Sequence, residues 1–364
     1  MYNFKEIDVR KAISNVKDLE LNMTLDELNA IEFVQFTDEK VIITLRLTQP
    51  IYQIAKSINE QCISELRKLS STAVFEILVK ENIVDISKRN VLPNVKNIIA
   101  VASGKGGVGK SSVAANLALA LSKLGAKVGI LDGDVYGPSQ PTMFGLANAK
   151  LEAMQSSDGS VKARPTKKFG IDIASMGFIM AQDQAAIVRG PMLAGYFSML
   201  FEQIDWGYLD YLIFDLPPGT GDIQLTLVQK IPLTGAVVVT TPQEISLADV
   251  RRSISMFEKV KVDILGVVEN MSYFTPPDAL DKKYYIFGQG GGEKISKEFG
   301  VDFLGEIPLD MTMRQYNDTG MPIIEREIDH PQSQIIMEIA RKVMAKNRVV
   351  NYANENNADL EISI

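Results

Sequence analysis

The fold of this chain is decided by residues 97–112, which read NIIAVASGKGGVGKSS. The apolar run Asn97–Ala102 predicts a buried strand, and the glycine-rich loop after it leads into a helix. Gly104 and Gly109 bracket four residues ahead of Lys110-Ser111, which is the spacing of a phosphate-binding loop. The stretch therefore predicts a nucleotide site between a strand and the helix that follows it.

The residue types of the loop explain how it would hold a phosphate. Glycines allow successive backbone N–H groups to point into one anion-sized hollow, and the helix N-terminus adds its positive end. The spacing lets Lys110 reach the β- and γ-phosphates and lets the Ser111 hydroxyl ligate Mg²⁺. The alternative is a flexible glycine turn, which the flanking strand and helix patterns disfavour.

Two more apolar runs end in carboxylates. Tyr211–Phe214 is followed by Asp215, and Lys127–Leu131 is followed by Asp132-Gly133-Asp134. The carboxyl ends of parallel strands meet at one edge of a sheet, so these side chains are expected near the loop. Asp215 suits an acid that holds Mg²⁺ through water, and one of the other two would position the attacking water. Helix capping and turn chemistry are the alternatives for these acids.

Residues 91–350 alternate short apolar runs with helical patterns, and residues 351–364 form a polar, acidic tail that we expect to be poorly ordered. The alternation predicts an α/β fold with a doubly wound, mostly parallel sheet and right-handed crossovers. The predicted strands are Asn97–Ala102, Lys127–Leu131, Ile171–Met176, Tyr211–Phe214, Ala236–Thr240, Ile264–Val268 and Val301–Ile307.

Residues 1–90 predict a small α/β (α+β) domain in front of this region. Helix-like spacing runs through Phe4–Leu21, and Ile31–Phe36 with Val41–Leu47 has the pattern of a hairpin. A helix with one apolar stripe follows Pro50, and a strand at Ala73–Val79 closes the domain. The candidate linker is Ser87–Asn94.

Composition excludes several classes of protein. The chain has 364 residues, 38 Lys and Arg against 45 Asp and Glu, and a formal charge of −7, which argues against general nucleic-acid binding. Its uncharged stretches fall well short of the roughly 20 apolar residues that cross a bilayer, and its first residues show no signal-peptide core. We therefore expect a cytoplasmic protein with no nucleic-acid and no membrane partner.

Longer motifs resemble a known family. Lys105 adds a second lysine to the loop and gives the KGGxGKS form of the deviant Walker A ATPases, which include MinD, ParA and the nitrogenase iron protein. Within that group the chain is similar to the Mrp/ApbC iron-sulfur carrier family, and residues 1–90 resemble the small iron-sulfur-assembly domain often fused in front of bacterial members. The matching segments are Gly104–Ser112, Asp132–Ser139, Asp215–Asp222, Glu269–Phe274, Phe287–Gly288 with Gly290–Gly292, and Gly305–Asp310.

The resemblance implies an ATP-hydrolysing homodimer with roles for individual residues. Lys105 would cross the dimer interface to the partner's ATP, and Gly219 would sense the γ-phosphate through its N–H. Asn270 would bind the adenine edge, and the backbone at Pro308 would flank the base. The implied catalytic residues are Lys105, Lys110 and Asp134, where Asp134 positions water, and the Mg²⁺ site would use Ser111 and, through water, Asp215. The implied ATP site comprises Gly104, Lys105, Gly106, Gly107, Val108, Gly109, Lys110, Ser111, Ser112, Gly219, Asn270 and Pro308.

One departure from the family concerns the cluster ligands. The family carries Cys-x-x-Cys shortly after the motif that ends here at Phe274, whereas this chain continues Thr275–Leu280 without a cysteine. The one cysteine of the chain, Cys62, lies on an apolar stripe and is expected to be a buried structural thiol. The spacing of Asp278, Asp281 and His330 does not support them as substitute ligands, and His330 is expected in a loop or at a helix start.

The leading hypothesis is a dimeric ATPase that carries or assembles iron-sulfur clusters, with apo iron-sulfur proteins and cluster scaffold proteins as partners. Without the cysteine pair, it would act as a nucleotide-driven adaptor that passes clusters held by other proteins. The alternative is a positioning ATPase of the MinD or ParA kind, whose membrane-binding form needs a basic amphipathic terminal helix. Gln334–Lys346 has an apolar side, but packing against the sheet is the simpler use of it. A nucleotide-sensing scaffold without hydrolysis is a third hypothesis, and the intact loop lysine and carboxylates argue against it.

Overall fold

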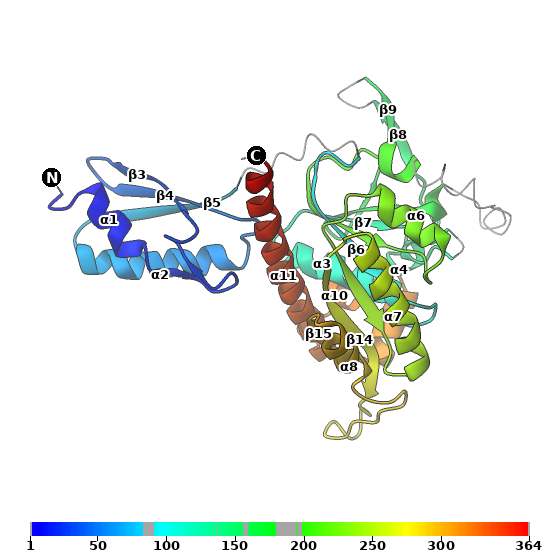
Figure 1. Cartoon of the computed structure of the whole chain (residues 1–364). Coiled ribbons are helices and arrows are strands. Elements are labelled where there is room, and N and C mark those ends of the chain that lie inside the picture. Colours follow the sequence, from blue (N-terminus) through cyan, green and yellow to red (C-terminus); the bar gives the residue numbers. More distant parts are fainter. Residues whose placement is uncertain are drawn as a thin grey trace. The chain divides into compact units, whose positions relative to one another are not determined.

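The computed structural model describes residues 2–82, 91–135, 137–155, 159–179, 195 and 199–362. The chain forms two compact units, of which one comprises Met1–Val84 with Met344–Ile364 and the other Asp85–Val343. Figure 1 shows the elements of both units along the chain. The last residues therefore belong with the first ones, a division that the sequence pattern does not reveal. The first four residues of the predicted linker Ser87–Asn94 lie outside the described part of the chain.

The larger unit is built on an eight-stranded sheet with the strand order β10-β11-β7-β12-β6-β13-β14-β15. Its neighbouring strands pair in parallel, except that β10 and β11 are antiparallel. The fold class and the seven predicted strands are confirmed, while the short, lysine-rich β10 gave no strand pattern. The strands are β6 (Val95–Ala102), β7 (Val128–Asp132), β10 (Thr166–Lys168), β11 (Ile171–Ser175), β12 (Leu209–Asp215), β13 (Gly235–Thr240), β14 (Ile264–Phe274) and β15 (Phe303–Leu309).

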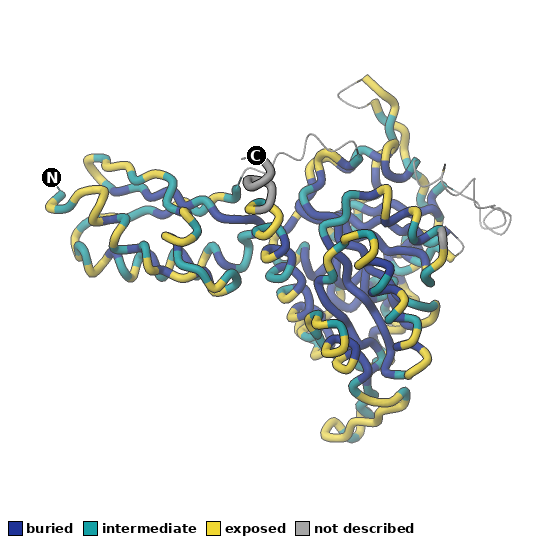
Figure 2. The backbone as a smooth tube through the Cα atoms, in the orientation of Figure 1, coloured by how far each residue is buried: buried dark blue, intermediate teal, exposed yellow. Residues whose placement is uncertain are grey.

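Helices flank this sheet, and its central strands are buried along their length (Figure 2). Alternating strand residues such as Ile98, Ala100 and Phe214 form one core with helices α6 to α8. Helix α3 packs on β6, β7 and β12, and it is buried because its Ala and Leu side chains are apolar on every side. The helices are α3 (Lys110–Lys123), α4 (Gln140–Met143), α6 (Asp222–Lys230), α7 (Glu244–Lys259), α8 (Gly291–Phe299), α9 (Met311–Asp318), α10 (Ile323–Arg326) and α11 (Pro331–Ile362). A small hairpin, β8 (Glu152–Gln155) with β9 (Val161–Arg164), and the 3₁₀ turn η1 (Met176–Phe178) complete this unit.

Strand register brings three chain segments to one edge of the sheet. Asp215, at the end of β12, pairs with Asp132 of β7 on one side and with Val101 of β6 on the other. Because β6 lies between β12 and β13, the loop after it emerges in the middle of that edge. Parallel pairing thus places the glycine-rich loop beside carboxylates that are distant in the sequence, as predicted.

The smaller unit packs two helices against a three-stranded sheet. Strands β3 (Ile31–Phe36) and β4 (Val41–Leu47) form the predicted hairpin, and β5 (Phe75–Glu81) pairs with β4 in parallel. Helix α2 (Ile54–Leu69) buries the predicted apolar stripe, including Cys62. The first helix is shorter than the predicted Phe4–Leu21. Helix α1 spans Glu6–Ile13, and the chain then turns through β1 (Lys17–Asp18) and β2 (Met23–Thr24), which leaves Leu19 exposed.

Helix α11 corrects the expectation of a poorly ordered acidic tail from Asn351, because the helix continues there to Ile362. Polar contacts within the smaller unit hold these turns. The Glu355 carboxylate accepts hydrogen bonds from Thr48 Oγ1 at 2.7 Å and from Asn82 Nδ2 at 2.8 Å. Asn351 Nδ2 donates to the Gln49 carbonyl at 3.1 Å. Two polar side chains of the predicted tail, Asn351 and Glu355, therefore make tertiary contacts.

Arg348 is the central contact of α11 in the smaller unit. Its side chain is fully buried and forms an ion pair with the buried Asp18 carboxylate. Its Nη1 also lies 3.1 Å from Glu20 Oε2, and its Nε donates to the Thr48 carbonyl at 2.8 Å. These ionic and hydrogen-bond contacts offset the desolvation cost of burying the guanidinium.

Within the described part of the chain, no helix combines the length and the apolar character needed to span a membrane.

We predict that Arg348→Met lowers the free energy of unfolding of the smaller unit by about 3–5 kcal/mol, because it leaves the Asp18 charge buried without its partner. Urea unfolding followed by far-UV circular dichroism measures this loss. The one tryptophan of the chain, Trp206, lies in the larger unit and reports that unit separately by fluorescence. Arg341→Met is the control, since that arginine is partly exposed and its ion pair with Glu338 lies at the surface. Equal transitions in both variants would contradict the prediction.

Candidate nucleotide-binding site

The loop between β6 and α3 is shaped by two glycines whose missing side chains are required. Gly109 has a φ of +80°, and a Cβ there would lie 2.2 Å from Asn270 Nδ2. A Cβ on Gly104 would lie 2.3 Å from the backbone of Asp249 in α7. At Gly107, by contrast, an added Cβ would meet nothing within 4 Å. The loop backbone is therefore pressed against the protein on one side and is accessible on the other, which suits a cradle for a phosphate.

Helix α3 begins directly behind this cradle. The Val113 N–H donates to the Gly109 carbonyl at 3.1 Å, which closes the first turn. The amide groups before Val113 have no earlier turn of the helix to bond with, as at every helix N-terminus, so they attract an anion. The geometry of residues 104–112 thus matches the phosphate-binding site that the sequence predicts.

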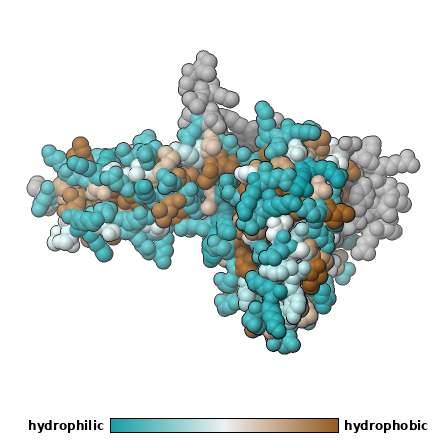
Figure 3. Space-filling model, turned by 60° about the horizontal axis from the view of Figure 1, so that its bottom comes forward, coloured by the Kyte–Doolittle hydropathy of each residue, from teal (hydrophilic) through white to brown (hydrophobic). Residues whose placement is uncertain are grey.

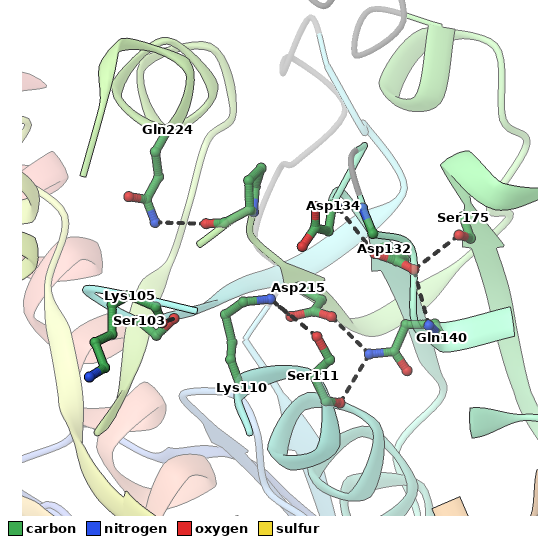
Figure 4. Close-up of polar contacts among 12 residues, drawn as sticks. Ser103, Lys105, Lys110, Ser111, Asp132, Asp134, Gln140, Ser175, Asp215 and Gln224 are labelled. Carbon is green, nitrogen blue, oxygen red and sulfur yellow. Dashed lines mark hydrogen bonds and ion pairs between the residues drawn. The ribbon is translucent and has the colours of Figure 1, made fainter. Parts of the chain in front are cut away.

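The ammonium of Lys110 lies at the centre of the site, where it contacts the Asp215 carboxylate (Figure 4). Both side chains are almost fully buried. The same Nζ atom lies 3.3 Å from the Ser111 hydroxyl. Three of the predicted residues, from two distant segments, therefore converge on one point at the carboxyl edge of the sheet.

Gln140, which the sequence analysis did not single out, connects this point to the segment after β7. Its Nε2 donates to Asp215 Oδ2 at 2.9 Å and to the Ser111 carbonyl at 3.0 Å. Its own backbone N–H donates to Asp132 Oδ2 at 3.1 Å. No sequence signal could have identified it, because a glutamine in a short helix has no motif and these partners meet only through tertiary pairing.

The two acids after β7 differ in environment. Asp132 is fully buried and accepts hydrogen bonds from Gln140 N, from Ser175 Oγ at 3.0 Å and from the Asp134 N–H at 3.1 Å. Burial, with the nearby Asp215 carboxylate as a second cause, raises the pKa of Asp132 to about 7. Asp134 is only partly buried and accepts from the Gly137 N–H at 3.2 Å. Asp132 thus braces the segment, and Asp134 is the acid that solvent can reach.

The donor atoms around Lys110 also fit a magnesium ion. Ser111 Oγ and Asp215 Oδ1 both contact the one ammonium, so a hydroxyl and a carboxylate oxygen converge on the same place. Oxygen donors of this kind are what Mg²⁺ prefers, together with phosphate oxygens and water. The residues present therefore suit the ion that the loop motif implies.

Lys105 and Gly219 flank the loop. The Lys105 side chain is directed away from Lys110 and Asp215 (Figure 4), and it forms no ion pair with any residue that the structure describes. The Ser103 hydroxyl donates to the Lys105 carbonyl at 2.9 Å, and the Ser103 carbonyl accepts from the Gly219 N–H at 3.2 Å. The Gly219 amide, predicted to sense the γ-phosphate, is thus engaged with the loop, at a φ of +102°.

Asn270 and Pro308, predicted for the base, and Ser112, predicted for the ATP site, each have a hydrogen-bond partner. Asn270 Nδ2 donates to the Val108 carbonyl at 2.8 Å, so the amide is fixed against the loop. The Pro308 carbonyl accepts from Gln332 Nε2 at 2.7 Å. Ser112 Oγ accepts from Asn317 Nδ2 at 2.6 Å, a second contact that sequence patterns did not indicate. These contacts leave the Asn270 carbonyl oxygen as the atom suited to the amino group of adenine.

The residues considered as cluster ligands are not assembled into a site. Cys62 is buried in the smaller unit, and burial raises the pKa of its thiol to about 12, which confirms the structural thiol. His330 Nδ1 accepts from the Gln332 N–H at 3.2 Å, which confirms its place at a helix start. Asp278 and Asp281 belong to an exposed segment after β14, and the described residues contain no group of three or more potential metal ligands.

That segment is closed at its base by paired backbone bonds. The Phe274 N–H donates to the Tyr284 carbonyl at 2.9 Å, and the Tyr284 N–H donates back at 2.8 Å. Leu280, Tyr284 and Ile286 are exposed on it. In Figure 3 hydrophilic residues cover most of the visible face, with separate hydrophobic patches between them. The place where the family has its cysteine pair is therefore an ordered surface segment without a thiol.

Two family models match the chain. Residues 94–344 match a model described as NUBPL iron-transfer P-loop NTPase, and residues 6–79 match one described as iron-sulfur cluster assembly protein. The iron-sulfur cluster carrier protein of Synechocystis sp. is 46% identical over 334 residues, which cover 91% of this chain and 94% of that protein. The protein of the same name in Escherichia coli K12 is 41% identical over 344 residues, covering 93% and 91%.

Solved structures show the same fold. A nucleotide-binding protein from Archaeoglobus fulgidus in complex with ADP is 40% identical, with a TM-score of 0.55 over 65% of this chain and 90% of that one. The cell-division ATPase MinD of Pyrococcus furiosus is 20% identical, with a TM-score of 0.50 over 68% and 98%. The second likeness concerns the fold alone.

The raised pKa of Asp132 predicts a pH-dependent stability. Between its ordinary value of 3.8 and about 7, the unfolded carboxyl has lost the proton that the folded one keeps. The Asp132 contribution to the free energy of unfolding therefore falls as the pH rises through this window and is lowest above it. Relative to Asp132→Asn, the wild type should lose stability from about pH 4 to 7, measured by urea unfolding with Trp206 fluorescence in EDTA. Parallel pH profiles of the two proteins would disprove the assignment.

Gly109→Ala should lower the free energy of unfolding by at least about 1–2 kcal/mol, the cost of a left-handed backbone for a residue with a Cβ. It should also weaken ADP binding, because the Cβ displaces Asn270 from the loop. Chemical unfolding and titration calorimetry measure the two effects. Gly137→Ala is the control, since a Cβ at this exposed glycine meets nothing within 4 Å. Wild-type ADP affinity in Gly109→Ala would refute the packing argument.

Proposed function

The chain belongs to the family of iron-sulfur cluster carrier proteins with a ParA-type P-loop NTPase unit, and on this premise we propose that it binds and hydrolyses ATP as a homodimer to drive cluster delivery. The observation that carries the proposal is the convergence of Lys110, Ser111 and Asp215 at the mouth of the glycine cradle. A structural glycine turn would not need a buried ammonium between a carboxylate and a hydroxyl. Delivery would be to apo iron-sulfur proteins, from cluster scaffold proteins.

The chemistry follows from the chain's own groups. The loop amides and the N-terminus of α3 bind the phosphates, and Lys110 leaves Asp215 to contact the β- and γ-phosphates. Ser111 and Asp215 would hold Mg²⁺, which supplies charge neutralisation at the phosphates when it is bound. Asp134, the solvent-accessible acid of the segment, orients the water that attacks the γ-phosphate. Asn270 and the Pro308 backbone hold the base.

Lys105 supports the dimer part of the proposal. Its ammonium is directed away from the site of its own chain, so it is available to the phosphates bound by a second copy. A cation added there stabilises the charge that develops in phosphoryl transfer. The Gly219 amide would leave the Ser103 carbonyl for the γ-phosphate, so that residues 217–222 respond to the nucleotide state.

The cluster is cargo in this proposal, and its ligands come from other proteins. A bridging [4Fe–4S] cluster takes four thiolates, whereas a homodimer of this chain has two cysteines, one per chain. Both are Cys62, whose buried thiol has a raised pKa and is a poor ligand. We therefore propose a nucleotide-driven adaptor that acts on clusters held by the scaffold protein and its recipient.

The alternative of a MinD-like positioning ATPase would need the apolar side of the terminal helix for membrane binding. The apolar side of α11 that membrane binding would use is buried, with Ile336 and Ile339 at 2% exposure and Val343 at 0%. Ile339 contacts the position of Gly305 in β15, and Lys342 Nζ donates to the Leu304 carbonyl at 2.9 Å. The stripe serves packing against the sheet, as the simpler interpretation held.

Lys105→Ala should bind ADP with wild-type affinity but lose at least about a hundredfold in ATP turnover, because the missing ammonium acts in the transition state of the partner's site. It should also lose ATP-dependent dimerisation. Calorimetry, steady-state phosphate release and light scattering measure these quantities. Lys259→Ala, at the exposed end of α7, is the matched control. Wild-type turnover in Lys105→Ala would contradict the dimer mechanism.

Anaerobic reconstitution with iron and sulfide should load the wild type and Cys62→Ser with the same small amount of iron and give no cluster absorbance. The reason is that the thiol is buried and that the described residues contain no group of three or more potential metal ligands. With ATP, the wild type should still accelerate transfer from a loaded scaffold to an apo-enzyme. A cluster spectrum that vanishes in Cys62→Ser would overturn the adaptor proposal.

A further inference from the structure

Gln140 makes several contacts inside the site, and the proposed mechanism gives it no role. It is fully buried in the one-turn helix α4, together with its neighbour Pro141. Both hydrogens of its side-chain amide are engaged, one by Asp215 Oδ2 and one by the Ser111 carbonyl. Both acceptors are unable to donate, so they fix which end of the amide faces them.

The same residue is anchored from behind. Its backbone N–H donates to Asp132 Oδ2, and that oxygen also accepts from Ser175 Oγ. The side chain and the backbone of one residue therefore join three segments, which are the end of β7, the start of α3 and the end of β12. Figure 4 shows Gln140 between Asp132 on one side and Asp215 with Ser111 on the other.

The side-chain carbonyl of Gln140 adds a second observation. Its Oε1 atom is buried and has no hydrogen-bond partner among the described residues. An unsatisfied buried acceptor is destabilising, and a leucine or methionine of similar volume would avoid that cost. The Oε1 atom therefore contributes nothing to folding, and the value of the amide lies in the two hydrogen bonds that its NH₂ group donates.

We propose that Gln140 is a positioning residue that holds the Asp215 carboxylate and the Ser111 backbone in place for Mg²⁺ while Lys110 moves to the phosphates. Asp215 has one oxygen on Lys110 and the other on Gln140. When the ammonium leaves, Gln140 alone keeps the carboxylate oriented with its free oxygen toward the ion. Because Gln140 belongs to the same segment as Asp134, it also ties the water-positioning acid to the metal end of the nucleotide.

This inference rests on the proposed nucleotide site. It predicts different effects of a Gln140 substitution on nucleotide binding without Mg²⁺ and on the steps that need Mg²⁺. Gln140 contacts the phosphate loop at the Ser111 carbonyl and at none of its N–H groups, so nucleotide affinity without Mg²⁺ should depend on it little. The gain in affinity from Mg²⁺ and the turnover number should depend on it. Loss of one hydrogen bond to a charged group corresponds to about a tenfold effect or more on each of these quantities.

The experiment compares the wild type with Gln140→Leu and Gln140→Met in the full chain. Calorimetry with ADP, in EDTA and over a series of Mg²⁺ concentrations, measures binding without reference to activity. We expect affinities within about twofold in EDTA and a roughly tenfold higher Mg²⁺ requirement in both variants, together with a lower kcat. Circular dichroism and thermal unfolding establish that the variants are folded, and the methionine variant keeps the test valid if leucine disturbs packing.

Ser175→Ala is the matched control. Ser175 donates to the same Asp132 oxygen as Gln140 but touches neither Asp215 nor Ser111. It should lower stability and leave the Mg²⁺ dependence of ADP binding unchanged. If a folded Gln140 variant keeps the wild-type Mg²⁺ dependence, or if Ser175→Ala shifts it equally, Gln140 is only structural. A wild type that binds Mg²⁺-ADP but does not hydrolyse ATP would instead contradict the proposed function and leave the binding test of Gln140 intact.

Discussion

The buried ammonium of Lys110 stands beside two acids that the sheet brings together, and the nucleotide site depends on that charge. Asp215 and Asp132 are paired across neighbouring strands and are both fully buried. Two carboxylates in that position repel each other and lose hydration, which is why the pKa of Asp132 rises. The lysine lessens the repulsion, and hydrogen bonds from Gln140, Ser175 and the backbone satisfy the remaining oxygens. The ion pair thus holds the Lys110 ammonium close to the position proposed for the nucleotide phosphates.

The arrangement also explains how one set of residues can serve two states. An ammonium bound to a carboxylate is replaceable, because phosphates offer it equivalent partners. The amide contacts of Gln140 and Asn270 lie on opposite sides of the loop and do not involve the lysine. The fixed contacts therefore define the cradle, while the Lys110 and Gly219 contacts are those that nucleotide can exchange.

The cluster function stands apart from the nucleotide chemistry in this chain. Its nucleotide unit has the glycine-rich loop with Lys110 against Asp215, but the segment after β14 has no thiol. In the proposed adaptor role, the chain would act through the proteins that hold the cluster, and nucleotide would control the recognition of those proteins. The smaller unit includes the last turns of α11, which the Arg348–Asp18 ion pair holds. As a compact unit of its own, it is available for such recognition.

The sequence by itself determined the succession of strands along the larger unit, the phosphate loop and the types of side chain at the sheet edge. It could do so because glycine spacing, apolar runs and terminal carboxylates are local properties that survive without tertiary contacts. It missed the helical continuation past Asn351 and the roles of Gln140 and Asn317. Those depend on partners far away in the chain, such as Thr48 for Glu355 and Asp215 for Gln140, and only the folded structure decides which polar side chain meets which partner.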